Sequence, residues 1–121
     1  MATQGELEAA ISAGVCQFER DYMGRGPEET KAYVVDDMIL VRLRGVLTPA
    51  EKQLARADAT GSGRTLIKQV RAELIEKARP MLEAILADVT KRKVRSLHTD
   101  ISTVTGERVI LFTLDGPPEH D

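Results

Sequence analysis

The amino-acid sequence predicts an α+β fold: an antiparallel sheet of about four strands packed on helices, in the order α-ββ-αα-ββ. Two observations carry this prediction. Apolar residues recur with helical spacing at the start and in the middle of the chain, and two alternating stretches each fold back on a short turn without a crossover. The chain has 121 residues, so we expect one domain over residues 1–115 and a disordered tail over 116–121.

The first element is an amphipathic helix, expected from about residue 5 to residue 22. Thr3 and Glu6 have the spacing of a capping box at its start, and Gly24 followed by Pro27 is typical of a helix end. Its apolar stripe consists of Leu7, Ile11, Val15, Phe18 and Tyr22.

A β-hairpin is expected between Thr30 and Leu43, because apolar and β-branched residues flank Asp36-Asp37, which suit a tight turn. In this register Val35 opposes Met38. One face is wholly apolar and carries Ala32, Val34, Ile39, Val41 and Leu43. The other face is mixed and carries Lys31, Tyr33, Val35, Met38, Leu40, Arg42 and Arg44.

A short helix should start after Thr48, which can cap it, with Pro49 in the first helical position and Glu51 completing a capping box. We expect this helix to end at about Asp58.

A flexible break over residues 60–63 separates it from a longer helix, expected from about Arg64 to Val89. Pro80 should kink or split this helix, because its ring removes one backbone hydrogen bond. The expected buried side consists of Leu66, Ile67, Val70, Leu74, Ala78, Leu82, Ile85 and Leu86.

A second hairpin is expected over about residues 93–102 and 107–114, turning near Thr105-Gly106. One face should carry Leu97, Ile101, Ile110, Phe112 and Leu114. The other should carry Val94, Ser96, His98, Asp100, Val109, Leu111 and Thr113.

The mixed face of the expected sheet is too apolar to be left in water. A second copy of the chain, or the first helix of that copy, would cover it, so we predict a homodimer. The apolar residues in question are Tyr33, Val35, Met38, Leu40, Val109 and Leu111.

The same face carries a candidate ligand site. Arg42 and Arg44 could hold a carboxylate or phosphate, and Asp100 could orient His98 as a base. The alternative is a polar rim with an Asp–Arg pair across strands. Arg25, between Gly24 and Gly26, is a further anion-binding candidate, and the alternative there is a simple helix stop.

Charge is unevenly spread, since residues 63–98 carry nine Lys and Arg against four acids while the whole chain has a net charge of −2. Lys91, Arg92 and Lys93 are therefore candidates for binding an acidic partner protein. The alternative is a solvated helix whose last turn carries cations that favour the helix dipole.

Several function classes are disfavoured. No nucleophile, metal cluster or cofactor motif is evident, since Cys16 is isolated and the only histidines are His98 and His120. We therefore expect a non-enzyme with no cofactor and no metal. An acidic total with 3% aromatics argues against nucleic-acid binding. No apolar run approaches the length of a membrane span, and no signal peptide is evident, so we expect a cytoplasmic protein without direct membrane insertion.

Two motifs, Gly45-Val46-Leu47-Thr48-Pro49-Ala50-Glu51 and His98-Thr99-Asp100-Ile101-Ser102, make the chain resemble the MpsC family over about residues 5–115. The resemblance implies an accessory or regulatory role beside a sodium-translocating, membrane-potential-generating system with a large membrane subunit. It carries over no catalytic residue. The sequence therefore favours an accessory protein acting by protein–protein contact, and the alternative is a small-ligand or anion sensor.

Overall fold

The computed structural model describes residues 2–56 and 60–121. Seven elements follow one another along the chain, and they confirm the α+β fold and the order α-ββ-αα-ββ. They are α1 (Gln4–Tyr22), β1 (Glu29–Val35), β2 (Met38–Arg44), α2 (Pro49–Arg56), α3 (Ser62–Thr90), β3 (Val94–Ile101) and β4 (Arg108–Leu114).

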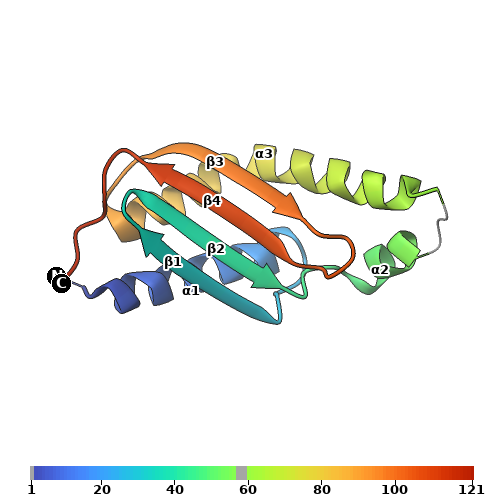
Figure 1. Cartoon of the computed structure of the whole chain (residues 1–121), viewed down its shortest axis with the longest axis horizontal. Helices are drawn as coiled ribbons and strands as arrows, with labels where there is room; N and C mark the ends of the chain where they lie inside the picture. The colour runs from blue at the N-terminus through green and yellow to red at the C-terminus, as the bar shows by residue number, and fades with distance from the viewer. Residues whose placement is uncertain (1, 57–59) are drawn as a thin grey trace.

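The four strands form one sheet in the order β1-β2-β4-β3, and every neighbouring pair is antiparallel. Helices α1 and α3 lie side by side across one face of this sheet, while α2 packs on α3 beyond the end of the strands (Figure 1). In the described part of the chain no element lies over the opposite face, which we call the outer face.

The first hairpin has the register expected from the sequence, with Val35 opposite Met38 and Val34 opposite Ile39. Asp36 adopts the left-handed conformation (φ 54°) that the tight turn requires. The predicted apolar face points toward the helices, where Ala32, Ile39, Val41 and Leu43 are buried.

The second hairpin differs from the prediction at its start. A bulge shifts the register between Val94 and Ser96, so that Val94 opposes Leu114 and packs against the core instead of lying on the outer face. Because a bulge inserts one residue, it reverses the alternation on one side only. Beyond it the expected faces are present, with Ile101, Ile110, Phe112 and Leu114 buried.

Helix α3 buries only part of the stripe expected of it: Ile67, Ala78, Leu82 and Leu86 are buried as predicted, but the stripe is displaced at the start of the helix. Leu66 and Val70 are each 49% exposed, whereas Arg71 and Ile75 are buried. The prediction assumed that apolar residues point inward, but here an arginine takes an inward position because a carboxylate meets it there.

Pro80 does not split α3, which is continuous from Ser62 to Thr90. The ring removes the hydrogen bond to the carbonyl of Glu76, one turn earlier. Both residues are exposed, so water can bind that carbonyl and the helix continues.

Helices α2 and α3 approach closely at Gly63, where an added Cβ would clash with the carbonyl oxygen of Leu54. Only glycine fits here, and its missing side chain allows α2 to lie close against α3. The expected end of α2 at about Asp58 lies outside the described residues.

Residues 116–121, expected to be a disordered tail, contact the segment after α3 and the N-terminal end of the described chain. Arg92 donates from Nε to the carbonyl of Pro117 at 2.9 Å, and the amide of Asp121 donates to the carbonyl of Ala2 at 2.9 Å.

Candidate functional site

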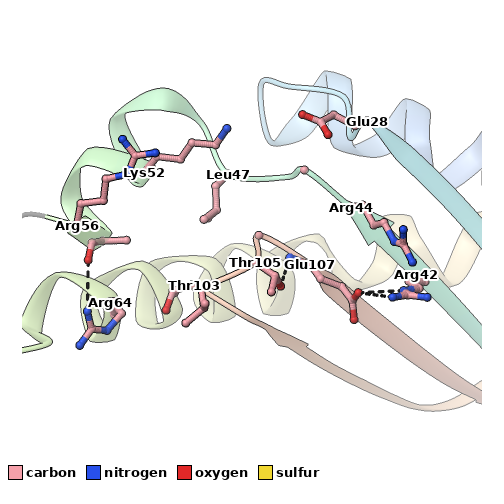
Figure 2. A pocket seen from close by; sticks show the side chains of 14 residues that line it. Glu28, Arg42, Arg44, Leu47, Lys52, Arg56, Arg64, Thr103, Thr105 and Glu107 are labelled. Carbon is pink, nitrogen blue, oxygen red and sulfur yellow. Dashed lines mark hydrogen bonds and ion pairs between the residues drawn. The ribbon is translucent and has the colours of Figure 1, made fainter.

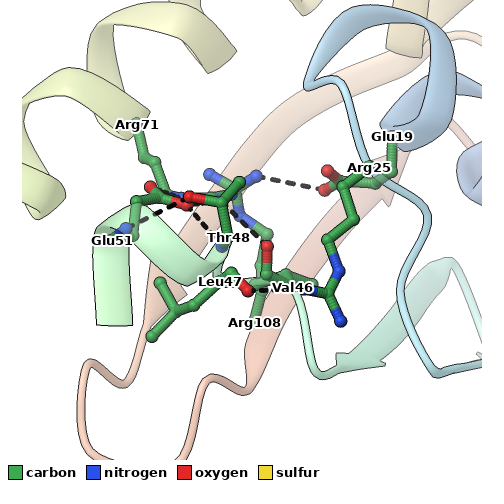
Figure 3. Close-up of polar contacts among 8 residues, drawn as sticks. All are labelled: Glu19, Arg25, Val46, Leu47, Thr48, Glu51, Arg71 and Arg108. Atoms are coloured by element: carbon green, nitrogen blue, oxygen red, sulfur yellow. Dashed lines mark hydrogen bonds and ion pairs between the residues drawn. The ribbon is translucent and has the colours of Figure 1, made fainter. Parts of the chain in front are cut away.

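Helix α2 is fixed at its start by one carboxylate with two roles. Glu51 accepts the Thr48 amide at 2.9 Å and its own amide donates to the Thr48 hydroxyl at 3.1 Å, which confirms the expected capping box. The same carboxylate accepts two hydrogen bonds from the buried Arg71 guanidinium, at 2.6 and 2.8 Å (Figure 3). Arg71 also donates to the Val46 carbonyl at 3.0 Å, so α3 holds the β2–α2 connection in place.

Partial burial raises the pKa of the Glu51 carboxyl, but the hydrogen bonds from Arg71 and from the Thr48 amide outweigh it, so that the pKa lies below its ordinary value of 4.5. Glu51 is therefore ionised at neutral pH, and the clamp on α2 is charge-assisted.

A second ion pair is fully enclosed between α1 and β4. Arg108 donates to Glu19 at 3.1 Å, and the two side chains are 2% and 1% exposed. Burial lowers the pKa of the Arg108 guanidinium and the Glu19 charge partly offsets this. Arg108 is the first residue of β4 and directly follows Glu107 and the turn before that strand.

On the outer face, cross-strand pairing arranges the side chains in rows. One row runs Lys31, Arg42, Val109, Asp100, and the next runs Tyr33, Leu40, Leu111, His98. The apolar residues of the face are only partly covered, since Tyr33 and Val35 on the edge strand β1 are 41% and 50% exposed and Met38, at the start of β2, is 36% exposed.

A cleft of about 680 Å³ opens where the outer face ends. We call it the basic cleft, because five cations and two carboxylates are among its described lining residues (Figure 2). The cations are Arg42 and Arg44 of β2, Lys52 and Arg56 of α2, and Arg64 of α3; the carboxylates are Glu28 and Glu107. Leu47 and the turn carrying Thr103 and Thr105 lie between the two groups of cations.

The structure separates the ligand-site candidates into two places. Arg42 and Arg44 line the basic cleft, and Arg42 binds Glu107 at 2.7 Å. His98 and Asp100 lie on the edge strand β3. The Asp100 carboxylate accepts the Ile101 amide at 2.8 Å and pairs with Lys68 at 3.4 Å.

Asp100 has a lowered pKa, first because of the hydrogen bond from the Ile101 amide and then because of Lys68, with slight burial acting the other way. The carboxylate is thus held ionised by these two groups.

Arg25 ties the loop after α1 to the β2–α2 connection. Its guanidinium donates to the Leu47 carbonyl at 3.1 Å (Figure 3). The guanidinium also lies 3.8 Å from the Glu28 carboxylate. Its main contact is thus with the chain's own backbone.

The partner-binding candidates lie at the far end of α3 from the basic cleft (Figure 1). Lys91 caps the helix in the left-handed conformation (φ 59°), and its side chain is exposed, as is that of Lys93. Arg92 is partly occupied by its hydrogen bond to Pro117.

The α2 and α3 cations of the cleft were missed from the sequence. Lys52 and Arg56 are four residues apart and therefore share one side of α2, which was the available signal. Their meeting with Arg42 depends on how α2 docks, and no local pattern encodes that.

Within residues 2–56 and 60–121, His, Cys, Asp and Glu nowhere gather in a group of three that could hold a metal ion. No helix in the same ranges is long and apolar enough to cross a membrane.

Comparison with known proteins gives the family. The family model described as Na+-translocating membrane potential-generating system (MpsC) matches residues 3–116. A Bacillus subtilis (strain 168) protein described as "Uncharacterized protein YbcI" is 43% identical over 112 residues, which cover 93% of this chain and 88% of that protein. No solved structure matches significantly. The chain belongs to the MpsC family.

Proposed function

We propose that this chain is a non-enzymatic accessory protein of a sodium-translocating, membrane-potential-generating system, and that it acts by protein–protein contact as a homodimer. The family description supports the link to that system. The observation that carries the mode of action is the outer face, where the large apolar side chains of Tyr33, Val35 and Met38 stay exposed on one half of the sheet.

A second copy is the occupant that fits this face, because the charges on its two edges are complementary. Lys31 on β1 and Asp100 on β3 lie at opposite ends of one row. Asp100 also pairs with Lys68 of its own chain at 3.4 Å, and its side chain is still 74% exposed in that pair. If two copies meet face to face about a two-fold axis parallel to the strands, β1 of one copy lies over β3 of the other. Each Lys31 then opposes an Asp100, twice per dimer.

The same arrangement matches the rest of the face. Strand β2 lies over β4 of the other copy, so Leu40 meets Leu111 in the apolar centre. A two-fold axis across the strands would instead place Lys31 over Val35, leaving a charge on an apolar side chain. Charge pairing therefore favours the axis parallel to the strands.

A charge swap tests this dimer. We expect light scattering to give twice the chain mass of 13.3 kDa at micromolar concentration. Lys31→Asp and Asp100→Lys should each weaken dimerisation, and the double variant should restore it. Within one chain the two residues are three strand spacings apart, about 14 Å, so rescue requires contact between copies.

The matched control is Lys77→Asp, which makes the same charge change at an exposed position on α3 and should leave the mass unchanged. A monomeric wild type, or a double variant as weak as the single ones, would show that the proposed dimer is wrong.

The role in the sodium system is tested in cells that carry it. Removing the chain should lower the sodium-dependent membrane potential, read with a potential-sensitive dye, and the wild type should restore it while Lys31→Asp should not.

We propose Lys91 and Lys93 as contacts for an acidic partner, so Lys91→Glu/Lys93→Glu should fail to restore the potential although it dimerises. An unchanged potential on removal would contradict the role.

A further inference from the structure

We propose that the basic cleft binds a small soluble ligand carrying several phosphate charges. This goes beyond the accessory function, which rests on the outer face, and gives the protein a site through which a metabolite can act on it.

The first argument is uncompensated charge. Of the two carboxylates in the cleft, Glu107 is engaged by Arg42 at 2.7 Å, and Glu28 lies 3.8 Å from Arg25, which is outside the lining. Among the cations, Arg44 lies 3.9 Å from Glu29, which is also outside the lining. In the described part of the chain no carboxylate pairs with the side chains of Lys52 and Arg56.

Arg64 adds a third cation beside them, and its guanidinium donates to the Ala55 carbonyl at 3.4 Å. Like charges four residues apart, as in Lys52 and Arg56, destabilise a helix. A bound anion would relieve this repulsion, which makes the site selective for negative charge.

The second argument is shape. The cations stand in two groups, on β2 and on α2–α3, with the 103–107 turn between them (Figure 2). A volume of about 680 Å³ is much larger than one phosphate and lies in the usual range for small-molecule sites. A ligand that reaches both groups must therefore be elongated.

The chemistry of the lining favours phosphate over carboxylate. The described lining residues have a formal excess of three positive charges. A phosphate group carries up to two negative charges and matches the guanidinium fork, so a short phosphate chain neutralises the cleft where a single carboxylate cannot. The hydroxyls of Thr103 and Thr105 add neutral donors.

The walls are held in place without a ligand. The Val46 amide donates to the Gly106 carbonyl at 3.2 Å, joining the β2–α2 connection to the turn before β4. Glu51 and Arg71 clamp α2. A preformed site binds without the entropic cost of ordering its walls.

Isothermal titration of the whole chain tests the site, with tripolyphosphate and orthophosphate in metal-free buffer at constant ionic strength. Tripolyphosphate should bind more tightly, because it reaches both cation groups. Lys52→Ala/Arg56→Ala should weaken its binding at least about tenfold, since two charge-assisted contacts are lost. Both side chains are exposed, so the variant should keep the fold and the dimer mass.

The control variant Lys77→Ala/Arg95→Ala removes the same charge elsewhere, also from one lysine and one arginine, and should bind like the wild type. No binding by the wild type, full binding by Lys52→Ala/Arg56→Ala, or equal loss in the control would overturn the proposal. Phosphatidylglycerol vesicles form a separate arm: binding to vesicles but not to tripolyphosphate would show that a lipid headgroup, and not a soluble ligand, is recognised. A dimer that binds no phosphate would leave the accessory role standing.

Discussion

The two faces of the sheet differ in how far they bury the same kinds of residue. Along β4, alternate side chains point toward the helices and are buried, namely Arg108, Ile110, Phe112 and Leu114. The side chains between them, Val109, Leu111 and Thr113, point outward and are only half-buried. The helices therefore bury one face of the sheet, and the other face stays partly exposed.

The arginines make the contrast sharper. Arg108 and Glu19 are almost completely enclosed, whereas the side chains of Arg42 and Glu107 are 40% and 34% exposed. Water screens the second pair but not the first, so breaking them should have very different costs. The inner pair stabilises one arrangement of α1 and β4, and the outer pair shapes a cleft.

The largest expected effect comes from breaking the inner pair. Arg108→Met leaves Glu19 as an uncompensated buried charge and should lower the free energy of unfolding by about 3–5 kcal/mol. The double variant Glu19→Leu/Arg108→Met removes both charges and should recover most of that loss. Urea denaturation measures the free energy of unfolding of both variants. A double variant as unstable as the single one would mean that the ion pair itself stabilises the fold.

A smaller effect is expected from substitutions at two adjacent residues of β4 whose side chains lie on opposite faces of the sheet. Ile110 is fully buried, so Ile110→Ala should cost about 2–5 kcal/mol of stability. Leu111→Ala should cost the isolated chain less than about 1.5 kcal/mol and should instead weaken dimerisation. Urea denaturation measures the stability of both variants, and light scattering measures their dimerisation. Equal losses of stability in the two variants would contradict the proposed difference between the faces.

The smallest effect concerns the Glu51 clamp and depends on pH. The pKa of Glu51 is lower in the folded chain than in the unfolded one, so its stabilisation is present above about pH 4.5 and is lost as pH falls through the folded value. Glu51→Gln should cost about 1–3 kcal/mol at neutral pH. The difference in free energy of unfolding between the wild type and Glu51→Gln should be smaller in urea titrations at about pH 3.5 than at neutral pH. A difference that does not change with pH would contradict the assigned pKa shift.

Local signals in the sequence predicted the fold well. The Asp36-Asp37 turn and the alternation around it fix the hairpin register. The Thr48 capping box fixes the start of α2. These features depend on residues close in sequence, so pattern and turn chemistry suffice.

The rest depends on tertiary contacts. Val94 faces the core because of a bulge, and Arg71 is buried because Glu51, on another helix, meets it there. Of the basic cleft, the sequence indicated only Arg42 and Arg44. Lys52, Arg56 and Arg64 join them through the docking of α2 and α3, which no local periodicity specifies.

The strand order β1-β2-β4-β3 also bears on how fast the chain folds. Each hairpin closes a short turn, but Leu40 and Leu111 pair across the two helices that separate them in the sequence. Closing that long loop costs conformational entropy before the stabilising contacts between β2 and β4 are made. We therefore expect the pairing of β2 with β4 to form in the rate-limiting step of folding. A φ-value near zero for Leu40→Ala in refolding kinetics would contradict this. The pairing of β2 with β4, which joins the two hairpins into one outer face, would thus also determine the folding rate.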